Sequence, residues 1–326
     1  MQRPRVTKTR SLDNHHASVS IHHADRVYNM LRDESASGRS ALAASWSRSL
    51  RHYGLSPNHN APPHRLDAPG YREARERSAL LLHAAQPVLD RLTSAVRRGG
   101  FCMLLSDARG IALEQRCLAA DEEIFSSWGL NLGAVWDEAH EGTNGIGTCL
   151  AEDRVLTIHR DQHFFSRNAG LSCTMAPIHD PSGSPIGGID ISSCREDCDT
   201  ATLSFLALVV EDAARRIETR LFGEAFADHR IISLGNEAQA LLAVDENEVI
   251  VGTNKAARAL FGLRPDRPMT LPDLLSDTGH EDPARAAHAA LQRVLKRCNG
   301  NISAAARELG VSRATLHRRL KRHEAH

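Results

Sequence analysis

The chain has 326 residues, and its 40 Lys and Arg balance 40 Asp and Glu, so the formal net charge at pH 7 is zero. A hydrophobic fraction of 41% supports folded cores and excludes a chain that is disordered throughout. The length predicts two or three domains. Because no apolar run approaches the roughly 20 residues of a membrane-spanning helix, we expect no membrane contact.

The N-terminal segment carries no signal for export. Residues 1–20 are basic and polar and lack the apolar stretch of a signal peptide. The seven cysteines, an odd number, are scattered along the chain, which favours a cytoplasmic protein with reduced and mostly buried thiols. We expect residues 1–34 to form a disordered tail and residues 35–86 a helical segment, in which Ser45–Pro57 predicts a helix ending at Gly54.

Residues 87–222 alternate between strand and helix patterns. The predicted elements are a hairpin, a short strand, a second hairpin and a long helix: Phe101–Leu113, Val155–Ile158, Cys173–Ile191 and Thr200–Phe222. Antiparallel strands flanked by helices are typical of an α+β sensor domain.

The stretch between the two hairpins is rich in glycine and histidine. The spacing of the glycines in Gly142–Thr148 matches neither a P-loop nor a dinucleotide-binding motif, and no Lys follows, so phosphate binding is disfavoured. His159 and His163 are four residues apart, but the glutamate that follows the first His in zinc proteases is missing. We therefore expect no cofactor and no metal here.

Cys194 and Cys198 flank Arg195–Asp197 in a predicted loop. A thiolate beside a cation is more reactive, so a metal or redox site is one interpretation. The spacing is not that of a zinc knuckle, and acidic neighbours oppose a thiolate. Two ordinary loop thiols are therefore the favoured interpretation.

Two short segments follow the sensor domain. Residues 223–264 contain Glu237–Leu263, which resembles the opening hairpin and helix of a PAS domain but is too short to complete one. Residues 265–283 are rich in Pro and Asp and predict a linker.

The last segment, residues 284–326, predicts three helices. The first, Ala284–Arg297, has apolar residues at helical spacing and ends before Gly300. The second is capped by Asn301 or Ser303 and ends at Gly310, and the third is basic. Two short helices at a steep angle, the second presenting donors to a major groove, form a helix-turn-helix.

Asn301–Leu320 resembles the Fis-type helix-turn-helix, which in that family binds DNA as a dimer. Arg313 and Arg318 are expected to contact guanine edges or nearby phosphates, since a bidentate contact gives about 1–3 kcal/mol of base discrimination. Hydroxyls, other basic side chains and helix N-termini position phosphates. The residues expected to contact DNA are Ser303, Ser312, Arg313, Thr315, His317, Arg318, Arg319 and Lys321.

Four segments closely resemble the GAF domain of acetoin-catabolism and glycerol or dihydroxyacetone regulators, relatives of enhancer-binding activators: Ser45–Pro57, Gly142–Thr148, His163–Asn168 and Ala176–Asp180. GAF folds hold a small ligand between the sheet and its covering loops, and the resemblance implies small alcohols, diols or carbonyl compounds. The implied pocket residues are Asn144, Thr148, His163, Arg167 and Asp190. A capping or turn role is the alternative for each of them.

Relatives of this kind usually carry an ATPase module before the DNA-binding domain. No Gly-x-x-x-x-Gly-Lys-Ser/Thr occurs in this sequence, and the interval between Leu263 and Ala284 is too short for such a module. We therefore expect that the chain does not hydrolyse ATP, which leaves activation and repression both open.

Together these patterns predict an α+β protein with N-terminal helices, a GAF sensor domain, a truncated PAS-like segment and an all-α C-terminal helix-turn-helix. The predicted function is a homodimeric transcription regulator that binds double-stranded DNA and a small-molecule effector and is not an enzyme, with a contact to RNA polymerase as a further option. Two alternatives stay open. One is a partner that modulates a full-length activator, and the other is a thiol-dependent GAF enzyme that uses Cys194 or Cys198.

Overall fold

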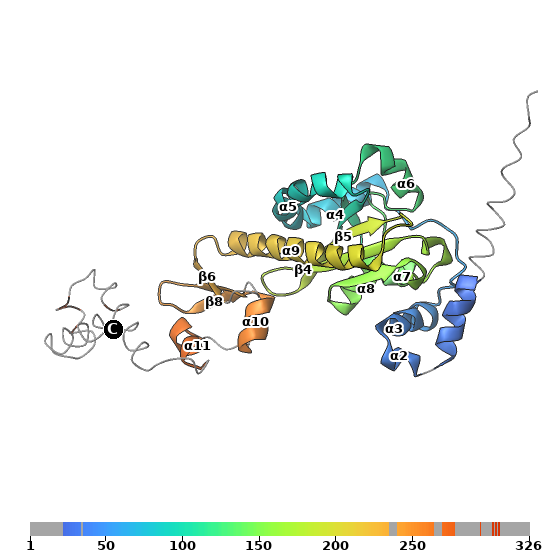
Figure 1. The fold of residues 1–326 in the computed structure, drawn as a ribbon. Coiled ribbons are helices and arrows are strands. Elements are labelled where there is room, and N and C mark those ends of the chain that lie inside the picture. The colour runs from blue at the N-terminus through green and yellow to red at the C-terminus, as the bar shows by residue number, and fades with distance from the viewer. Residues whose placement is uncertain are drawn as a thin grey trace, which may run out of the picture. The chain divides into compact units, whose positions relative to one another are not determined.

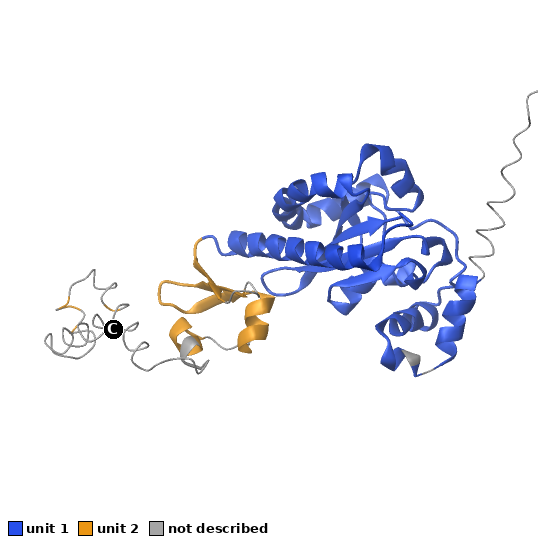
Figure 2. Cartoon of the chain, in the orientation of Figure 1, with its two compact units in different colours: residues 1–227 blue, residues 228–326 orange. Residues whose placement is uncertain are grey.

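The computed structural model describes residues 22–33, 35–234, 240–263 and 269–277, together with Val294, Ile302, Ala304 and Ala306. The chain divides into two compact units, residues 1–227 and residues 228–326 (Figure 2). The described part of the first unit contains a five-stranded sheet, and that of the second contains a three-stranded sheet.

The sheet of the first unit is antiparallel, with strand order β2-β1-β5-β4-β3 (Figure 1). Its strands are β1 Cys102–Asp107, β2 Ala112–Arg116, β3 Leu156–His159, β4 Ser172–His179 and β5 Pro185–Ser193. The two predicted hairpins are β1–β2 and β4–β5, and the predicted long helix is α9 Thr200–Ala225. These elements confirm the α+β class.

One face of this sheet is covered by α9 and α5 Ala79–Arg98, with α4 Ala68–Arg77 beside them (Figure 1). The domain boundary expected between residues 86 and 87 falls inside α5, which continues through Pro87. Leu81, Ala85 and Leu89 are buried on both sides of Pro87. Packing of this apolar face on the sheet therefore offsets the backbone hydrogen bond that Pro87 cannot donate.

The opposite face of the sheet is covered by two shorter helices, α6 Glu122–Ser127 and α8 Gly145–Glu152, and α7 Glu138–Glu141 packs on α8. Phe125, Trp136 and Ile146 are buried in the core on this side. Three 3₁₀ turns complete the connections: Ala119–Asp121, Arg160–Gln162 and Ser166–Asn168.

The N-terminal helices pack on the loops beyond α8. They are a helix over residues 22–32, α2 Ala36–Arg39, α3 Ala41–Ser47 and the π-helical turn η1 Arg48–His52. Val27, Leu31 and Trp46 are buried with Phe164 and Phe165. The expectation of a disordered tail up to residue 34 is therefore wrong for residues 22–32, where apolar side chains at helical spacing bury against the domain.

The second unit contains β6 Arg230–Leu234, β7 Ala240–Val244 and β8 Ile250–Thr253 in an antiparallel sheet, followed by α10 Lys255–Phe261 and α11 Leu271–Asp277. The α11 helix lies in segment 265–283, for which the sequence predicts a linker. Leu271 and Leu274 are buried in the core of this unit, so the unit continues to Asp277. Pro272 and Asp273, two of the residues that suggest a linker, occupy the first turn of α11, where both residue types are tolerated.

Candidate functional site

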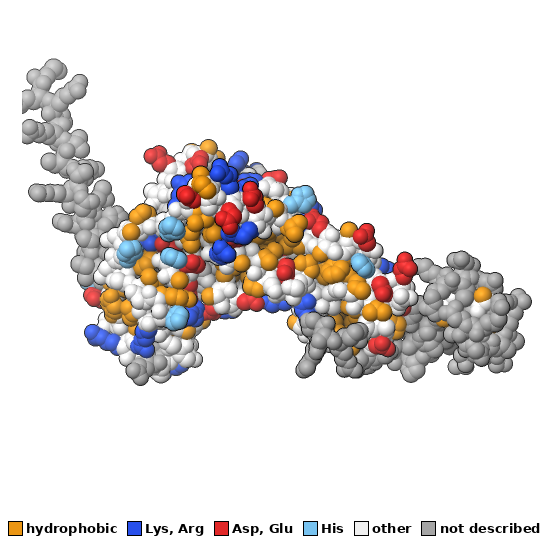
Figure 3. Space-filling view, turned by 180° about the vertical axis from the view of Figure 1, so that it is seen from behind, with side chains coloured by type: hydrophobic (Ala, Val, Ile, Leu, Met, Phe, Trp, Pro, Cys, Tyr) orange, Lys and Arg blue, Asp and Glu red, His pale blue; other side chains and the backbone are white. Residues whose placement is uncertain are grey.

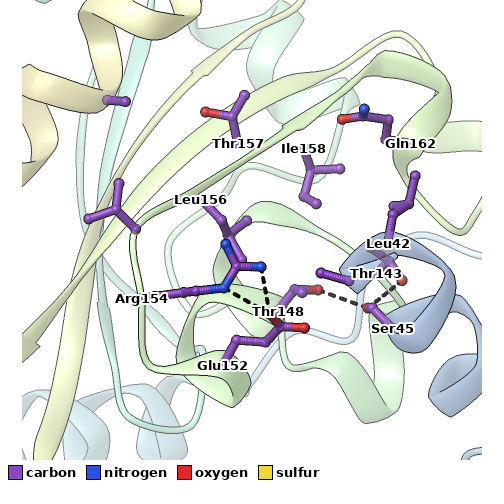
Figure 4. A pocket seen from close by; sticks show the side chains of 13 residues that line it. Leu42, Ser45, Thr143, Thr148, Glu152, Arg154, Leu156, Thr157, Ile158 and Gln162 are labelled. Atoms are coloured by element: carbon purple, nitrogen blue, oxygen red, sulfur yellow. Dashed lines mark hydrogen bonds and ion pairs between the residues drawn. The ribbon is translucent and has the colours of Figure 1, made fainter. Parts of the chain in front are cut away.

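A pocket of about 410 Å³ opens at the β3 edge of the large sheet (Figure 4). Side chains from α3, α8, β3 and α9 line it. Leu42, Leu156 and Ile158 give it an apolar wall, and its polar lining includes Ser45, Thr143, Thr148 and Gln162. Its volume lies within the range of small-molecule sites, about 300–1,000 Å³.

Glu138 is the centre of a hydrogen-bonded cluster behind this pocket, and it is only 4% exposed. Its Oε1 accepts hydrogen bonds from the hydroxyls of Ser45 and Thr148, the latter at 3.0 Å. Arg48 donates to both carboxylate oxygens, from Nε at 2.8 Å and from Nη2 at 3.0 Å. Thr143 Oγ1 lies 2.6 Å from Ser45 Oγ. The cluster fastens α3 to α7 and α8 and holds three hydroxyls at the pocket.

The glycine run Gly142–Thr148 connects α7 to α8 and forms the first turn of α8, which begins at Gly145. Asn144 caps this helix, because its Oδ1 accepts a hydrogen bond from the backbone N–H of Gly147 at 2.8 Å. A Cβ on Gly147 would lie 2.4 Å from the backbone N of Glu138 and 2.6 Å from the carbonyl O of Trp136. The glycines therefore allow the close backbone packing that brings α8 to the pocket.

Of the five pocket residues predicted from the sequence, Thr148 lines this pocket and the other four do not. Arg167 donates to both carboxylate oxygens of Glu141, at 2.7 and 2.9 Å, and its guanidinium lies 4.5 Å from the ring centre of Phe165. Burial raises the pKa of Glu141 to about 7 against the opposing attraction of Arg167. This pair connects α7 with the 3₁₀ turn Ser166–Asn168.

His163 and Asp190 belong to a second polar cluster, closed between the sheet and α8. His163 Nε2 lies 3.5 Å from Cys173 Sγ, and Ser192 Oγ lies 3.2 Å from the same sulfur and 2.6 Å from Asp190 Oδ2. All four side chains are at most 4% exposed. Burial lowers the pKa of His163 to about 4 and raises the pKa of Asp190 to about 7. Burial thus favours the uncharged form of both groups.

The histidines and loop cysteines considered for metal binding lie apart. His159 Nδ1 is 2.8 Å from Ser172 Oγ, whereas His163 faces Cys173. Burial raises the pKa of both Cys194 and Cys198, which favours their thiol forms. Across the part of the chain that the structure describes, no group of three or more His, Cys, Asp or Glu side chains is placed to hold a metal ion.

The residues predicted to contact DNA lie outside the described residues. They are Ser303, Ser312, Arg313, Thr315, His317, Arg318, Arg319 and Lys321. On the face shown in Figure 3, basic side chains of the first unit lie among acidic ones. The prediction of a DNA contact rests on the sequence of residues 284–326.

Ser45, Thr143 and Glu138 are site residues that the sequence alone does not single out. Ser45 and Glu138 are 93 positions apart in the chain, so their contact depends on the folded domain. The available signal is the stretch Trp136–Thr148, where acidic and hydroxyl side chains stand between apolar residues and glycines.

Two known protein families match this chain, one in its N-terminal part and one near its C-terminus. The family described as "MimR, N-terminal domain" matches residues 24–219. The chain belongs to this family. The family described as "Bacterial regulatory protein, Fis family" matches residues 288–323, which confirms the resemblance of the C-terminal segment to a Fis-type helix-turn-helix.

Two regulators illustrate the similarity of the MimR-family chain to curated proteins. The acetoin catabolism regulatory protein of Cupriavidus necator is 32% identical over 224 residues, which are 67% of this chain and 34% of that protein. The propane 2-monooxygenase operon transcriptional activator MimR of Mycolicibacterium smegmatis is 31% identical over 185 residues, 56% of this chain and 30% of that protein. The chain thus spans about a third of the length of these relatives.

Among solved structures, the Escherichia coli DhaR(N)–DhaL complex matches with a TM-score of 0.52 and 17% identity, over 69% of this chain and 77% of that chain. At this identity the likeness concerns the fold alone, and it supports the predicted α+β fold of the N-terminal domain. The two curated relatives are named as transcription regulators and not as enzymes, in agreement with the prediction. None of the described helices is long and apolar enough to span a membrane.

Proposed function

We propose that this MimR-family chain regulates transcription by binding double-stranded DNA through residues 284–326. The observation that carries the proposal is the presence of the MimR-family domain and a Fis-type segment in one chain. In such segments the second helix of the motif enters the major groove. The basic third predicted helix, with Arg313 and Arg318, suits guanine edges and phosphates. Because the 326 residues contain no P-loop motif, the proposal includes no ATP hydrolysis by them.

The pocket at the β3 edge is the proposed site of the effector. The hydroxyls of Ser45, Thr143 and Thr148 offer donors and acceptors to an alcohol or carbonyl oxygen, while Leu42 and Ile158 face its carbon skeleton. One relative is named for acetoin catabolism. We therefore propose small alcohols, diols or carbonyl compounds as ligands.

We propose that the α9 helix transmits the effect of ligand binding in this pocket. Ala207 lines the pocket from α9. At the C-terminal end of α8, Asp153 Oδ1 lies 2.5 Å from His179 Nε2, and Glu218 Oε1 on α9 lies 2.6 Å from His179 Nδ1. The histidine thus joins the end of α8 to α9. A ligand that binds one arrangement of α8 more tightly would shift α9 through this contact.

An exposed apolar strip on α9 supports pairing with a second protomer in this proposal. Phe205 is 64% exposed and Leu208 is 66% exposed, one turn apart on the helix. Two helix-turn-helix units in a dimer need half-sites about 34 Å apart or a multiple of that distance. A change in the pairing of α9 would alter this separation and so the affinity for DNA.

The full chain should bind DNA from its own promoter region selectively, and the double variant Arg313→Ala/Arg318→Ala should bind about tenfold more weakly or worse. Each bidentate guanine contact is worth about 1–3 kcal/mol, and about 1.4 kcal/mol is a factor of ten in affinity. A titration at two salt concentrations measures this, since phosphate contacts make affinity fall as salt rises.

Arg72→Ala is the matched control for that titration. Arg72 is an exposed arginine on α4 and belongs neither to the predicted DNA contacts nor to α9, so its loss should leave the affinity for DNA unchanged. Equal, unselective binding by the wild type and the double variant would contradict the proposal. It would favour instead a partner that acts through a full-length activator.

Ala207→Phe should abolish effector binding, because a phenyl ring on α9 would fill part of the pocket. Ala201→Phe is the control, since Ala201 is exposed on the same helix and does not line the pocket. Calorimetric titration with acetoin, glycerol and dihydroxyacetone measures binding to the wild type and both variants. Binding retained by Ala207→Phe would show that the site is elsewhere, and no binding to the wild type would contradict the ligand class.

A further inference from the structure

Two cysteines meet at the open end of the β1–β2 hairpin. In this pair of antiparallel strands Met103 is opposite Arg116, and the same register continued by one residue places Cys102 opposite Cys117. The two thiols are close enough for each to shift the pKa of the other. Both side chains pack into the core on the α8 side of the sheet.

The geometry of this cross-strand pair suits a disulfide. Residues directly opposite one another in antiparallel strands have Cα atoms about 4.5–5.5 Å apart. Disulfides join Cα atoms about 4.4–6.8 Å apart. Cys102 and Cys117 can therefore form an S–S bond with little movement of the backbone.

The two thiols have different environments. Cys102 is fully buried, and both the neighbouring Cys117 thiol and its burial raise its pKa. Cys117 is partly exposed, and the neighbouring Cys102 thiol lowers its pKa, although burial and the carboxylates of Glu122 and Asp121 oppose this effect. Arg97 Nε donates a hydrogen bond to the carbonyl O of Cys117 at 3.0 Å, and the positive charge of Arg97 further lowers the pKa of the Cys117 thiol. Cys117 is thus the accessible nucleophile and Cys102 the buried partner.

The other described cysteines do not share this arrangement. Burial raises the pKa of Cys149, Cys173, Cys194 and Cys198. Of the six cysteines within the described ranges, Cys117 is the one whose pKa is lowered. Among the described cysteines, the combination of a cross-strand cysteine neighbour and a lowered pKa is thus confined to Cys117.

We propose that Cys102 and Cys117 are a modification site at which hydroperoxides produce a disulfide. The Cys117 thiolate attacks one oxygen of the peroxide, the O–O bond breaks, and the other oxygen leaves with the electron pair and takes up a proton. Cys117 becomes a sulfenic acid. Cys102 sulfur then displaces hydroxide from Cys117 sulfur, and the thiol proton of Cys102 leaves with it as water. Two thiols are oxidised and one peroxide is reduced.

Peptide mapping of the full chain tests this site. After exposure to hydrogen peroxide, alkylation of the remaining thiols and tryptic digestion, we expect residues 99–109 cross-linked to residues 117–154. Fragment ions should place the bond at Cys117 and not at Cys149, and reduction should remove the cross-link. Wild-type protein in which Cys102 and Cys117 both remain alkylated, or in which the cross-link joins other cysteines, would overturn the proposal.

Three variants assign the roles of the two sulfurs. Cys102→Ala should leave Cys117 as a sulfenic acid that dimedone traps, because the buried partner is missing. Cys117→Ser should leave Cys102 unmodified at the same peroxide concentration, and Cys194→Ser should keep the cross-link. Oxidation of Cys102 in Cys117→Ser at the wild-type rate would contradict the assigned order. The wild-type map gives the main result even where a variant folds poorly.

Discussion

Gly147→Ala should lower the free energy of unfolding of the MimR-family domain by roughly 3 kcal/mol or more. A Cβ at this position would lie 2.4 Å from the backbone N of Glu138, 2.6 Å from the carbonyl O of Trp136 and 2.7 Å from the carbonyl C of Asp137. Separations under 3.0 Å are essentially never seen for real Cβ atoms. The contacted atoms are backbone, and Trp136 is 1% exposed, so relief requires movement of α8 or of a buried loop. Denaturant unfolding followed by tryptophan fluorescence measures the loss.

Gly223→Ala supplies the matched control for this prediction. Gly223 lies within α9, and a Cβ there would have no atom within 4 Å. Since alanine favours the helix over glycine by about 0.5–1 kcal/mol, the variant should be slightly more stable than the wild type. The same Gly→Ala substitution should thus lower the free energy of unfolding at position 147 and raise it at position 223. Wild-type stability in Gly147→Ala would show that the glycine run has another role.

The hairpins are predictable from the sequence because their turns are local. At the β1–β2 turn, Asp107 Oδ1 accepts hydrogen bonds from the backbone N–H groups of Arg109 and Ile111, both at 2.9 Å. Such Asx turns depend on a few adjacent residues. The pairing of β1 with β5 depends on contacts between distant segments, so the order of strands in the sheet does not follow from local patterns.

The proline signals show where local patterns mislead. Pro87 suggests a boundary, but burial of the α5 face keeps the helix continuous. Pro272 suggests a linker, yet it stands in the first turn of α11, after Thr270, whose Oγ1 accepts a hydrogen bond from Asp273 N at 3.3 Å. A proline in a sequence indicates a restricted backbone, and the surrounding packing decides whether a helix ends or begins there.

Side-chain type alone also does not separate a pocket from a closed polar interior. Thr148 and Asp190 both suit a ligand, but Thr148 lines the pocket and Asp190 is held by Ser192 beneath α8. The cysteines show the same limit. Cys194 and Cys198 are close in the chain, whereas Cys102 and Cys117 meet through strand register, which only the fold reveals.

The contribution of Asp190 to the free energy of unfolding should fall as the pH rises from 5 to 7, and the variant Asp190→Asn should lack this pH dependence. Burial raises the pKa of Asp190 from 3.8 to about 7. Ser192 donates to its Oδ2, and its Oδ1 has no hydrogen-bond partner. Between these two pKa values the folded carboxyl keeps a proton that the unfolded chain has released, so stability falls by about 1.4 kcal/mol per pH unit. Because the decline levels off near the folded pKa, we expect the wild type to lose roughly 2 kcal/mol relative to the variant across this range.

The comparison with Asp190→Asn is needed because other buried groups titrate in the same window. Burial lowers the pKa of His163 from 6.5 to about 4. As the pH falls, the unfolded chain therefore binds this proton before the folded protein does, so the contribution of His163 to the free energy of unfolding rises with pH. Glu141, whose pKa burial raises to about 7, acts with the sign of Asp190. Both groups are present in the wild type and the variant, so the difference between the two proteins' denaturant unfolding curves at each pH reports the Asp190 carboxyl together with its coupling to the cluster. A constant difference from pH 5 to pH 7 would mean that Asp190 is ionised in the folded protein, and that the closed cluster beneath α8 stabilises a charge through contacts other than the Ser192 hydroxyl.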